Sequence, residues 1–401
     1  MSSEYTRRKL IKTGSTVAGA VALAGLGTAA SANLTVPEYL DYDAMGLAKL
    51  VARKKVSPTE LLDTAIELTE RWNPQLNAIV IKHYDLARAQ IAAGLPEGPL
   101  RGVPFILKDL YLSLDGTETS NGSQLFKGAI ANYSSTLVER YQQAGLVIFG
   151  KGASPEFGGT ATTESRLYGE THNPWSLDYS PGGSSGGCAA AVAAGILPAA
   201  NASDGGGSIR IPASNCGLFG LKPTRGRVPL GPNIYEAAAG VSVAHAVTRS
   251  VRDSALLLDL SRGMAPYEPY TAPPVEDAYL NEIKRKPGKL RIGLISRTFL
   301  GTPIDRECVK AVTDAAVLCA SLGHEVEEIG ALPIDPRRYF SAMTIISSAA
   351  TAATIRAREL QLGRKATPEE LEVNTWTKMQ DAVKYTATDY YNERQQYFQV
   401  G

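Results

Sequence analysis

The sequence predicts an α/β fold, a sandwich of helices around one mixed sheet. Between residues 57 and 329, short apolar runs of strand type alternate with segments of helical periodicity. The chain has 401 residues, of which 44% are hydrophobic and 20% charged, so it can bury a large core. No internal repeat is evident.

The first predicted helix has the clearest start signal. Ser57 is placed as the N-cap, Pro58 as the first helical residue and Glu60 as the third, which together form a capping box, and the helix is expected to reach about Trp72. The elements expected after it are strand 77–81, helix 84–93, strand 103–107 leading to Lys108, helix 135–144, strand 146–151, helix 189–195, strand 240–248, helix 250–260, a buried strand 290–295, helix 305–321 and strand 325–329. Helical periodicity returns over 339–361 and 368–399.

The N-terminal segment has the pattern of an export signal. Arg7 and Arg8 lie in a charged region, an uncharged apolar run spans 13–29, and Ala-Ser-Ala at 30–32 is an A-x-A cleavage signal. The pattern predicts a twin-arginine-type signal peptide over 1–32, a mature chain from Asn33, a periplasmic or secreted location and no stable membrane insertion after cleavage. The alternative is an uncleaved membrane anchor, and the glycines and the short length of the apolar run argue against it.

Residues 180–227 contain two Gly-Ser clusters separated by an Ala-rich helical stretch. In the second cluster, Gly205, Gly206 and Gly207 stand directly before Ser208. Glycines let backbone N–H groups converge on one oxygen atom, and such donors stabilise the oxyanion of acyl transfer by roughly 3–4 kcal/mol each. Ser208 therefore lies where a nucleophile would be needed.

A serine nucleophile needs a base to take its proton. The four histidines lie outside both clusters, whereas Lys108 follows the apolar run 103–107 and should emerge at the end of a buried strand. Burial disfavours the charged form of an amine and lowers its pKa, so Lys108 is a candidate base.

These motifs resemble the defining block of the amidase signature family, serine hydrolases that cleave amide bonds with a Ser-Ser-Lys triad. The resemblance covers about residues 42–400. It implies that Ser208 is the nucleophile, that Ser184 relays the proton after a cis Gly183–Ser184 peptide bond, that Lys108 is the base and that backbone groups of residues 205–207 hold the oxyanion. It also implies an α/β/α sandwich with a large mixed twisted β-sheet covered by helices on both faces.

No cofactor or metal is implied by this resemblance, and the expected partner is a small-molecule amide substrate, linear or cyclic. Gly205 and Ala202 depart from the residue types that relatives usually carry, but both keep the backbone donors in place. The run 359–376 resembles hydrolases of the nylon-oligomer type, which act on linear and cyclic amides.

Two other interpretations of the Gly-Ser clusters compete with this one. A flexible linker is excluded because apolar, helix-forming sequence separates the clusters. The stretch 182–186 also fits G-x-S-x-G, the nucleophile elbow, but that motif follows a strand, and the preceding segment 173–181 holds two prolines. An elbow would further need a later histidine, for which His245 and His324 are weak candidates. No S-x-x-K, phosphate-loop, CxxC or H-E-x-x-H motif occurs in the sequence.

Charge and cysteine content set further bounds. The formal net charge is +1, and the predicted signal carries four cations and one anion in its charged region, so the mature chain has a net charge of −2, which argues against a nucleic-acid partner. All four cysteines stand in apolar sequence; Cys188 and Cys216 are expected to be packed thiols. Cys308 and Cys319 lie about three helical turns apart, too far to form a disulfide.

The family normally continues for a further stretch beyond the last residue of this sequence. We therefore expect a single amidase domain over 33–401 that lacks its C-terminal part. Two alternatives remain open: a subunit resembling the glutamine amidotransferase A chain, which would pass ammonia to a partner, and an inactive truncated remnant. An export signal argues against the first, since such partners are cytosolic.

Overall fold

The computed structural model describes residues 34–298, 300–330 and 335–400. The signal peptide predicted over 1–32 and the mature start predicted at Asn33 lie outside the described residues. Within the described residues, no helix combines the length and the apolar character needed to cross a membrane.

The described chain forms two compact units. The first contains the residues up to Leu280 together with Ile355–Trp376, and the second contains Asn281–Thr354 together with the residues from Thr377 onward. Every residue of the predicted active site belongs to the first unit. The single domain predicted over 33–401 stays a prediction.

The strands of the first unit form two three-stranded sheets and one small two-stranded sheet, with strand orders β1-β3-β2, β6-β8-β7 and β4-β5. β2 and β3 are parallel, whereas the pairs β1–β3, β6–β8 and β7–β8 are antiparallel, so strand directions are mixed as predicted. The bounds are β1 Ile79–Lys82, β2 Pro104–Lys108, β3 Val147–Gly152, β4 Glu164–Ser165, β5 Gly169–Glu170, β6 Ala199–Asp204, β7 Phe219–Gly220 and β8 Val243–Thr248.

The prediction was one large continuous sheet. Among the described residues the strands instead form separate sheets, although β2 and β6 pack side by side. At the end of β2, the backbone N–H of Lys108 donates to Oδ1 of Asn201 on β6 at 3.1 Å. The Nδ2 group of Asn201 donates in turn to the carbonyl oxygen of His245 on β8 at 3.0 Å. A side-chain amide, instead of a backbone ladder, thus joins the two sheets at this point.

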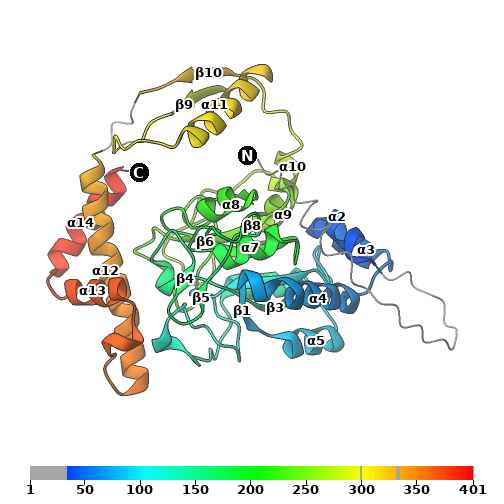
Figure 1. Ribbon diagram of the computed structural model, residues 1–401, viewed down its shortest axis with the longest axis horizontal. Coiled ribbons are helices and arrows are strands. Elements are labelled where there is room, and N and C mark those ends of the chain that lie inside the picture. The colour runs from blue at the N-terminus through cyan, green and yellow to red at the C-terminus, as the bar shows by residue number, and fades with distance from the viewer. Residues whose placement is uncertain (1–33, 299, 331–334, 401) are drawn as a thin grey trace. The chain divides into compact units, whose positions relative to one another are not determined.

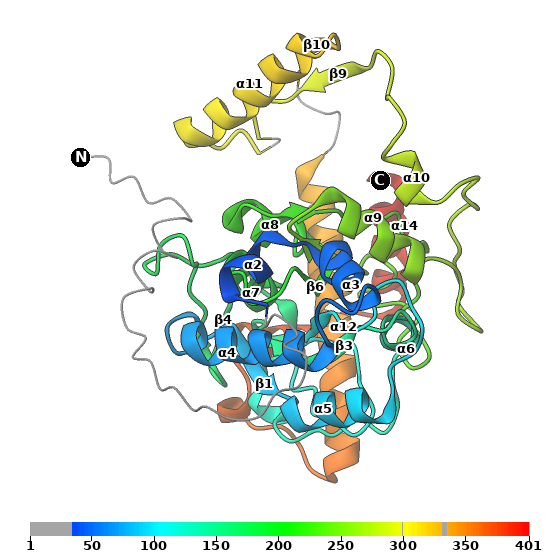
Figure 2. The ribbon, with the colours of Figure 1, turned by 90° about the vertical axis from the view of Figure 1, so that its right-hand side faces the viewer.

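Helices lie on both faces of the β1-β3-β2 sheet. In two perpendicular views, α7 (Gly186–Ala193) and α5 (Tyr84–Ala93) lie on opposite sides of β1 and β3 (Figures 1 and 2). Side chains alternate between the faces of a strand, and β3 follows this rule. Phe149 stacks on Tyr84 of α5, with ring centroids 6.2 Å apart, whereas a Cβ at Gly152 would lie 2.7 Å from the Sγ of Cys188 on α7.

The helix predicted to begin at Ser57 is α4. Its capping box is present: the N–H of Glu60 donates to Ser57 Oγ at 3.2 Å, and the N–H of Ser57 donates to Glu60 Oε2 at 2.7 Å. The helix ends at Leu76, one turn later than predicted, where Asn77 adopts the left-handed conformation. α4 spans Pro58–Leu76, and the other helices of this region are α2 Val36–Asp41, α3 Ala44–Ala52, η1 Gln124–Phe126, α6 Thr136–Gln143, η2 Glu156–Gly158, α8 Arg210–Cys216, α9 Val251–Ser261 and α10 Tyr279–Glu282.

The core of the first unit includes α7, the strands and the buried faces of α3, α4, α6 and α9. All residues of β2, β3 and β8 are buried, as are the residues of α7 from Gly186 to Val192. The small side chains of α7 let its backbone approach the strands closely, and each large apolar side chain buried here contributes about 1.5–3 kcal/mol. The thiols of Cys188 and Cys216 are free and buried in this core, as predicted.

In the second unit, β9 (Arg291–Leu294) pairs in parallel with β10 (Glu325–Glu328), and α11 (Arg306–Ser321) packs on β10. The prediction that the strand at 290–295 is buried is wrong: Leu290 is 44% exposed and Ile295 37% exposed. A two-stranded sheet packed by one helix leaves one face uncovered. Cys308 is also exposed, contrary to its apolar sequence surroundings, and neither it nor Cys319 forms a disulfide.

The remaining segments are helical, as predicted, but they are divided differently. The stretch predicted as 339–361 is the single helix α12, whereas the stretch predicted as 368–399 contains a 3₁₀ turn and two helices. The bounds are α12 Pro336–Leu362, η3 Pro368–Glu370, α13 Val373–Ala382 and α14 Ala387–Val400.

Candidate active site

Lys108 is the last residue of β2, and its side chain is 0% exposed. The apolar residues before it hold the strand in the core, so the amine is buried within the fold. Its Nζ donates to Ser184 Oγ at 2.6 Å and to Ser203 Oγ at 3.0 Å. The structure therefore brings together the predicted base and the predicted relay, and it adds Ser203.

Burial lowers the pKa of Lys108 to about 7, because the charged ammonium loses its hydration. Cys188 and Asp204 act in the opposite direction. Burial raises the pKa of Cys188 to about 12, so this residue is a neutral thiol near pH 7, and Asp204 is then the opposing charge. At neutral pH, a large share of Lys108 is the free amine that a base must be.

Ser184 is 2% exposed and follows a cis peptide bond from Gly183. Glycine is required before it, since a Cβ at Gly183 would lie 2.3 Å from the carbonyl oxygen of Thr162. The next residue, Ser185, donates from Oγ to the carbonyl oxygen of Ser203 and accepts from its N–H, both at 3.3 Å. This pair of bonds fixes the turn that carries Ser184 against β6.

Ser208 lies on the loop between β6 and α8 and is half-buried. The loop is held by Asp204, which is 0% exposed and accepts from the N–H groups of Gly207 at 2.8 Å and Ile209 at 3.2 Å. Arg210 donates to the same carboxylate from Nε at 2.9 Å and from Nη2 at 3.0 Å. Burial alone would raise the pKa of Asp204, but these hydrogen bonds and the charge of Arg210 outweigh it and lower the pKa.

The three predicted oxyanion donors differ in their present partners. The N–H of Gly207, whose φ is +126°, donates to Asp204, whereas no acceptor is bonded to the N–H of Gly205 or Gly206 within the described part of the chain. Ser208 likewise makes no hydrogen bond to Ser184 among these residues. The geometry thus shows the Lys108–Ser184 half of the predicted triad in contact, with Ser208 carried at the end of β6.

A small cavity lies at Ser203, whose Oγ accepts a hydrogen bond from Lys108. It has a free volume of about 20 Å³, which is room for about one water molecule. Three residues of its lining are polar, Ser203, Ser242 and Tyr111. The others are apolar: Leu110, Leu112, Leu230, Ile234, Ala237 and Ala244.

The structure does not favour the nucleophile elbow. No strand precedes Ser184 within residues 173–181. His245 lies on β8, 0% exposed, with Nε2 2.9 Å from Ser254 Oγ, and burial lowers its pKa to about 4. His324 lies in the second unit, where its Nδ1 accepts from the N–H of Leu290. The described residues include no group of three or more His, Cys, Asp or Glu side chains placed to hold a metal ion.

Sequence reasoning missed Asn201, Ser203 and Asp204 as parts of the site. Asp204 had a weak signal, because it directly precedes the glycine run. Asn201 and Ser203 had none, since an isolated Asn or Ser in an Ala-rich segment carries no local pattern.

Comparison with known proteins agrees with this geometry. The family described as Amidase matches residues 60–398. The 6-aminohexanoate-cyclic-dimer hydrolase of Paenarthrobacter ureafaciens is 38% identical over 349 residues, which are 86% of this chain and 70% of that protein.

Two solved structures are also similar. A 6-aminohexanoate cyclic dimer hydrolase complexed with substrate superposes with a TM-score of 0.84 and 35% identity, covering 89% of this chain and 75% of the other. A bacterial aryl acylamidase of the amidase signature family gives a TM-score of 0.81 and 29% identity, covering 88% and 75%. The chain therefore belongs to the amidase signature family and is an amidase, a hydrolase of carbon–nitrogen bonds.

Proposed function

We propose that this amidase cleaves carboxylic amides, linear or cyclic, through an acyl-enzyme formed on Ser208. The observation that carries the proposal is the 2.6 Å contact between Ser184 Oγ and the Nζ of Lys108, a buried amine whose pKa is lowered to about 7. A surface lysine would be charged and unable to accept a proton. This one is poised to do so.

In the proposed first half-reaction, Ser208 Oγ attacks the amide carbon. Its proton passes to Ser184 Oγ, while the Ser184 proton passes to Lys108 Nζ, which becomes an ammonium. The carbonyl oxygen becomes an oxyanion that accepts from the N–H groups of Gly205 and Gly206. The N–H of Gly207, which donates to Asp204 in this structure, is the third proposed donor.

Collapse of this intermediate breaks the carbon–nitrogen bond. The leaving nitrogen takes a proton back from Ser184, which recovers one from the Lys108 ammonium, so the amine departs neutral. Water then attacks the acyl-enzyme by the same proton route, and the carboxylic acid is released with Ser208 restored. All proton carriers belong to this chain.

The substrate class is inferred from the cavity lining and from the similar proteins. The apolar lining beside Lys108 favours an aliphatic or aryl acyl group, in line with the names of the hydrolases and acylamidase that this chain resembles. We also propose that residues 1–32 direct export through the twin-arginine route, on the sequence pattern alone.

The test compares hydrolysis of a simple anilide and of the 6-aminohexanoate cyclic dimer by the wild type and by Ser208→Ala. We expect turnover of at least one substrate by the wild type and none by the variant. Release of ammonia only when a partner protein is present would favour the amidotransferase alternative, and a folded wild type inert to both amides would favour the inactive remnant. For export, Arg7→Lys with Arg8→Lys should retain the protein in the cytoplasm.

A further inference from the structure

A large groove lies on the first unit, away from the residues of the proposed triad. It is bordered by α3, the start of α4, the segment 97–101 and Leu256 of α9, and its volume is about 960 Å³. None of Lys108, Ser184 or Ser208 lines it. This volume is at the upper end of the range of small-molecule sites.

The groove is separated from the reacting atoms by the length of a strand. Arg101 of its border precedes β2, and Lys108 ends β2. β2 runs from Pro104 to Lys108, and a strand of five residues is about 13 Å long. Because β2 lies between the groove and Lys108 and no triad residue lines the groove, a small molecule held there would not be the amide being cleaved.

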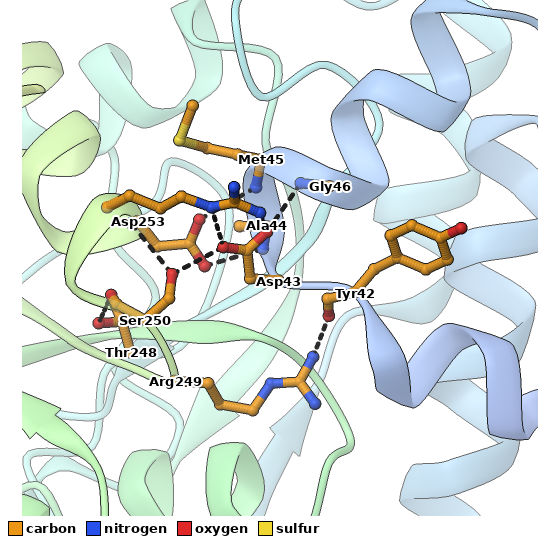
Figure 3. A network of polar contacts seen from close by, with 10 residues as sticks. Tyr42, Asp43, Ala44, Met45, Gly46, Thr248, Arg249, Ser250 and Asp253 are labelled. Atoms are coloured by element: carbon orange, nitrogen blue, oxygen red, sulfur yellow. Dashed lines mark hydrogen bonds and ion pairs between the residues drawn. The ribbon is translucent and has the colours of Figure 1, made fainter.

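The wall formed by α3 is held rigidly. Asp253 accepts from the N–H groups of Ala44 at 2.8 Å and Met45 at 3.0 Å, and Asp43 accepts from the N–H of Gly46 at 2.9 Å. Ser250 Oγ also donates to Asp43, at 2.8 Å. Figure 3 shows these contacts, with the Met45 side chain turned away from the two carboxylates. The groove is thus formed before any ligand arrives.

Its floor is apolar. Met45, Ala48 and Val51 lie along one stripe of α3, spaced by three residues, and they face Val56 and Leu256. Ala48, Val56 and Leu256 are each at most 8% exposed, so the floor is packed rather than loose. An alkyl chain is the complement of such a surface.

The rim is cationic. Lys49, Lys54 and Lys55 line the groove, and within the described part of the chain none of the three forms an ion pair with a carboxylate. Lys54 has a φ of +54°, a left-handed conformation that is unfavourable for a residue with a Cβ. Strain of this kind persists where the surrounding structure enforces it, here at the end of α3.

Neither carboxylate of the lining forms an ion pair with these lysines. Glu60 accepts from the N–H and the Oγ of Ser57 at 2.7 Å in the capping box. Glu97 pairs with Arg101. With Arg101 counted, the lining has four positive and two negative side chains, so an excess of two positive charges surrounds an apolar floor.

We propose that this groove binds a free amphipathic carboxylate, with its alkyl chain on the floor and its carboxylate among Lys49, Lys54 and Lys55. The chemistry is that of a medium- or long-chain fatty acid. The inference goes beyond the proposed function and does not depend on the triad.

The test is calorimetric titration of the full chain with dodecanoate below its micelle concentration. We expect one saturable site, much weaker binding of dodecanol, which lacks the charge, and no binding of acetate, which lacks the chain. Lys49→Glu and Lys55→Glu should each weaken dodecanoate binding about fivefold or more. The matched control is Lys127→Glu, an exposed lysine outside the groove, which should leave binding unchanged. Ala48→Trp should fill the floor and abolish binding.

Circular dichroism confirms that each variant is folded, and the surface lysine variants keep the test decisive if Ala48→Trp does not fold. Absence of saturable binding overturns the proposal, as does equal binding of dodecanol. Binding that survives both lysine substitutions would place the ligand elsewhere. Sedimentation with phosphatidylglycerol vesicles, without binding of monomeric dodecanoate, would indicate a membrane surface and would also overturn it.

Discussion

The proposed role of Lys108 makes activity depend on pH in a specific way, because the amine must be neutral before the reaction starts. Burial lowers its pKa to about 7, so roughly a tenth of the enzyme has the free base at pH 6 and roughly a hundredth at pH 5. As the pH falls, protonation removes the active form. We therefore expect kcat/KM for an anilide to fall about tenfold per pH unit below 7 and to level off above it.

Other groups with shifted pKa values must be distinguished from Lys108 as the cause of this acid limb. Burial, with the nearby charge of Asp43, raises the pKa of Asp253 to about 6, whereas burial lowers the pKa values of His83 and His245 to about 4. The histidines are thus neutral across the limb. Asp253→Asn should leave the limb in place if Lys108 causes it.

The decisive variant is Lys108→Arg. A guanidinium stays protonated at every working pH and cannot accept the proton of Ser184. General base catalysis contributes about 10²–10⁴-fold, so kcat should fall by that factor and the acid limb should disappear. Lys151→Arg is the matched control: Lys151 is also 0% exposed, on the neighbouring strand β3, but its Nζ bonds to Thr119 and to the carbonyl oxygen of Leu112.

Steady-state kinetics from pH 5 to 9, with circular dichroism of each variant, completes the test. Lys151→Arg should keep the limb, since it adds the same bulk without removing the base. If Lys108→Arg retained most of the wild-type kcat while folded, Lys108 would be a structural cation and the Ser-Ser-Lys mechanism would have to be abandoned. A wild-type limb centred near pH 4 would contradict the assignment equally.

Three further substitutions test the rest of the site. Ser208→Ala should abolish labelling by a fluorophosphonate probe without unfolding the protein; labelling that persists and maps to Ser184 by mass spectrometry would restore the elbow hypothesis. Ser203→Ala removes a hydrogen bond that stabilises the Lys108 ammonium, so the pKa of Lys108 should fall and the acid limb of kcat/KM should move to lower pH; an unmoved limb would make Ser203 a packing residue. Asp204→Asn weakens the acceptor that holds the nucleophile loop, so the free energy of unfolding should drop by about 1–3 kcal/mol and kcat should also fall. Normal values for both would refute the role assigned to Asp204.

Elements with strong local signals were predicted closely. α5 has the bounds 84–93 that its periodicity indicates, and α4 begins at the predicted capping box. β6 was missed because its sequence, Ala-Ala-Asn-Ala-Ser-Asp, contains no β-branched or aromatic residue. It forms a strand because β8 supplies a partner, which a propensity argument does not see.

Burial in the second unit was misjudged for a related reason. An apolar run predicts that a strand is buried, but the number of layers packed on the strand depends on the whole fold. β9 pairs with β10 in a two-stranded sheet, and its flanking residues Leu290 and Ile295 are partly exposed as a result.

The sequence by itself determined the family, the reaction class and the identities of the candidate nucleophile, relay and base, because glycine runs, capping residues and apolar periodicity act over a few neighbouring positions. Only the tertiary structure decided that the Nζ of Lys108 contacts Ser184, 76 positions away, and Ser203, 95 positions away. It also decided the protonation state of Lys108. A lysine pKa depends on how much water and charge surround the amine, and that environment exists only when distant segments have packed around it.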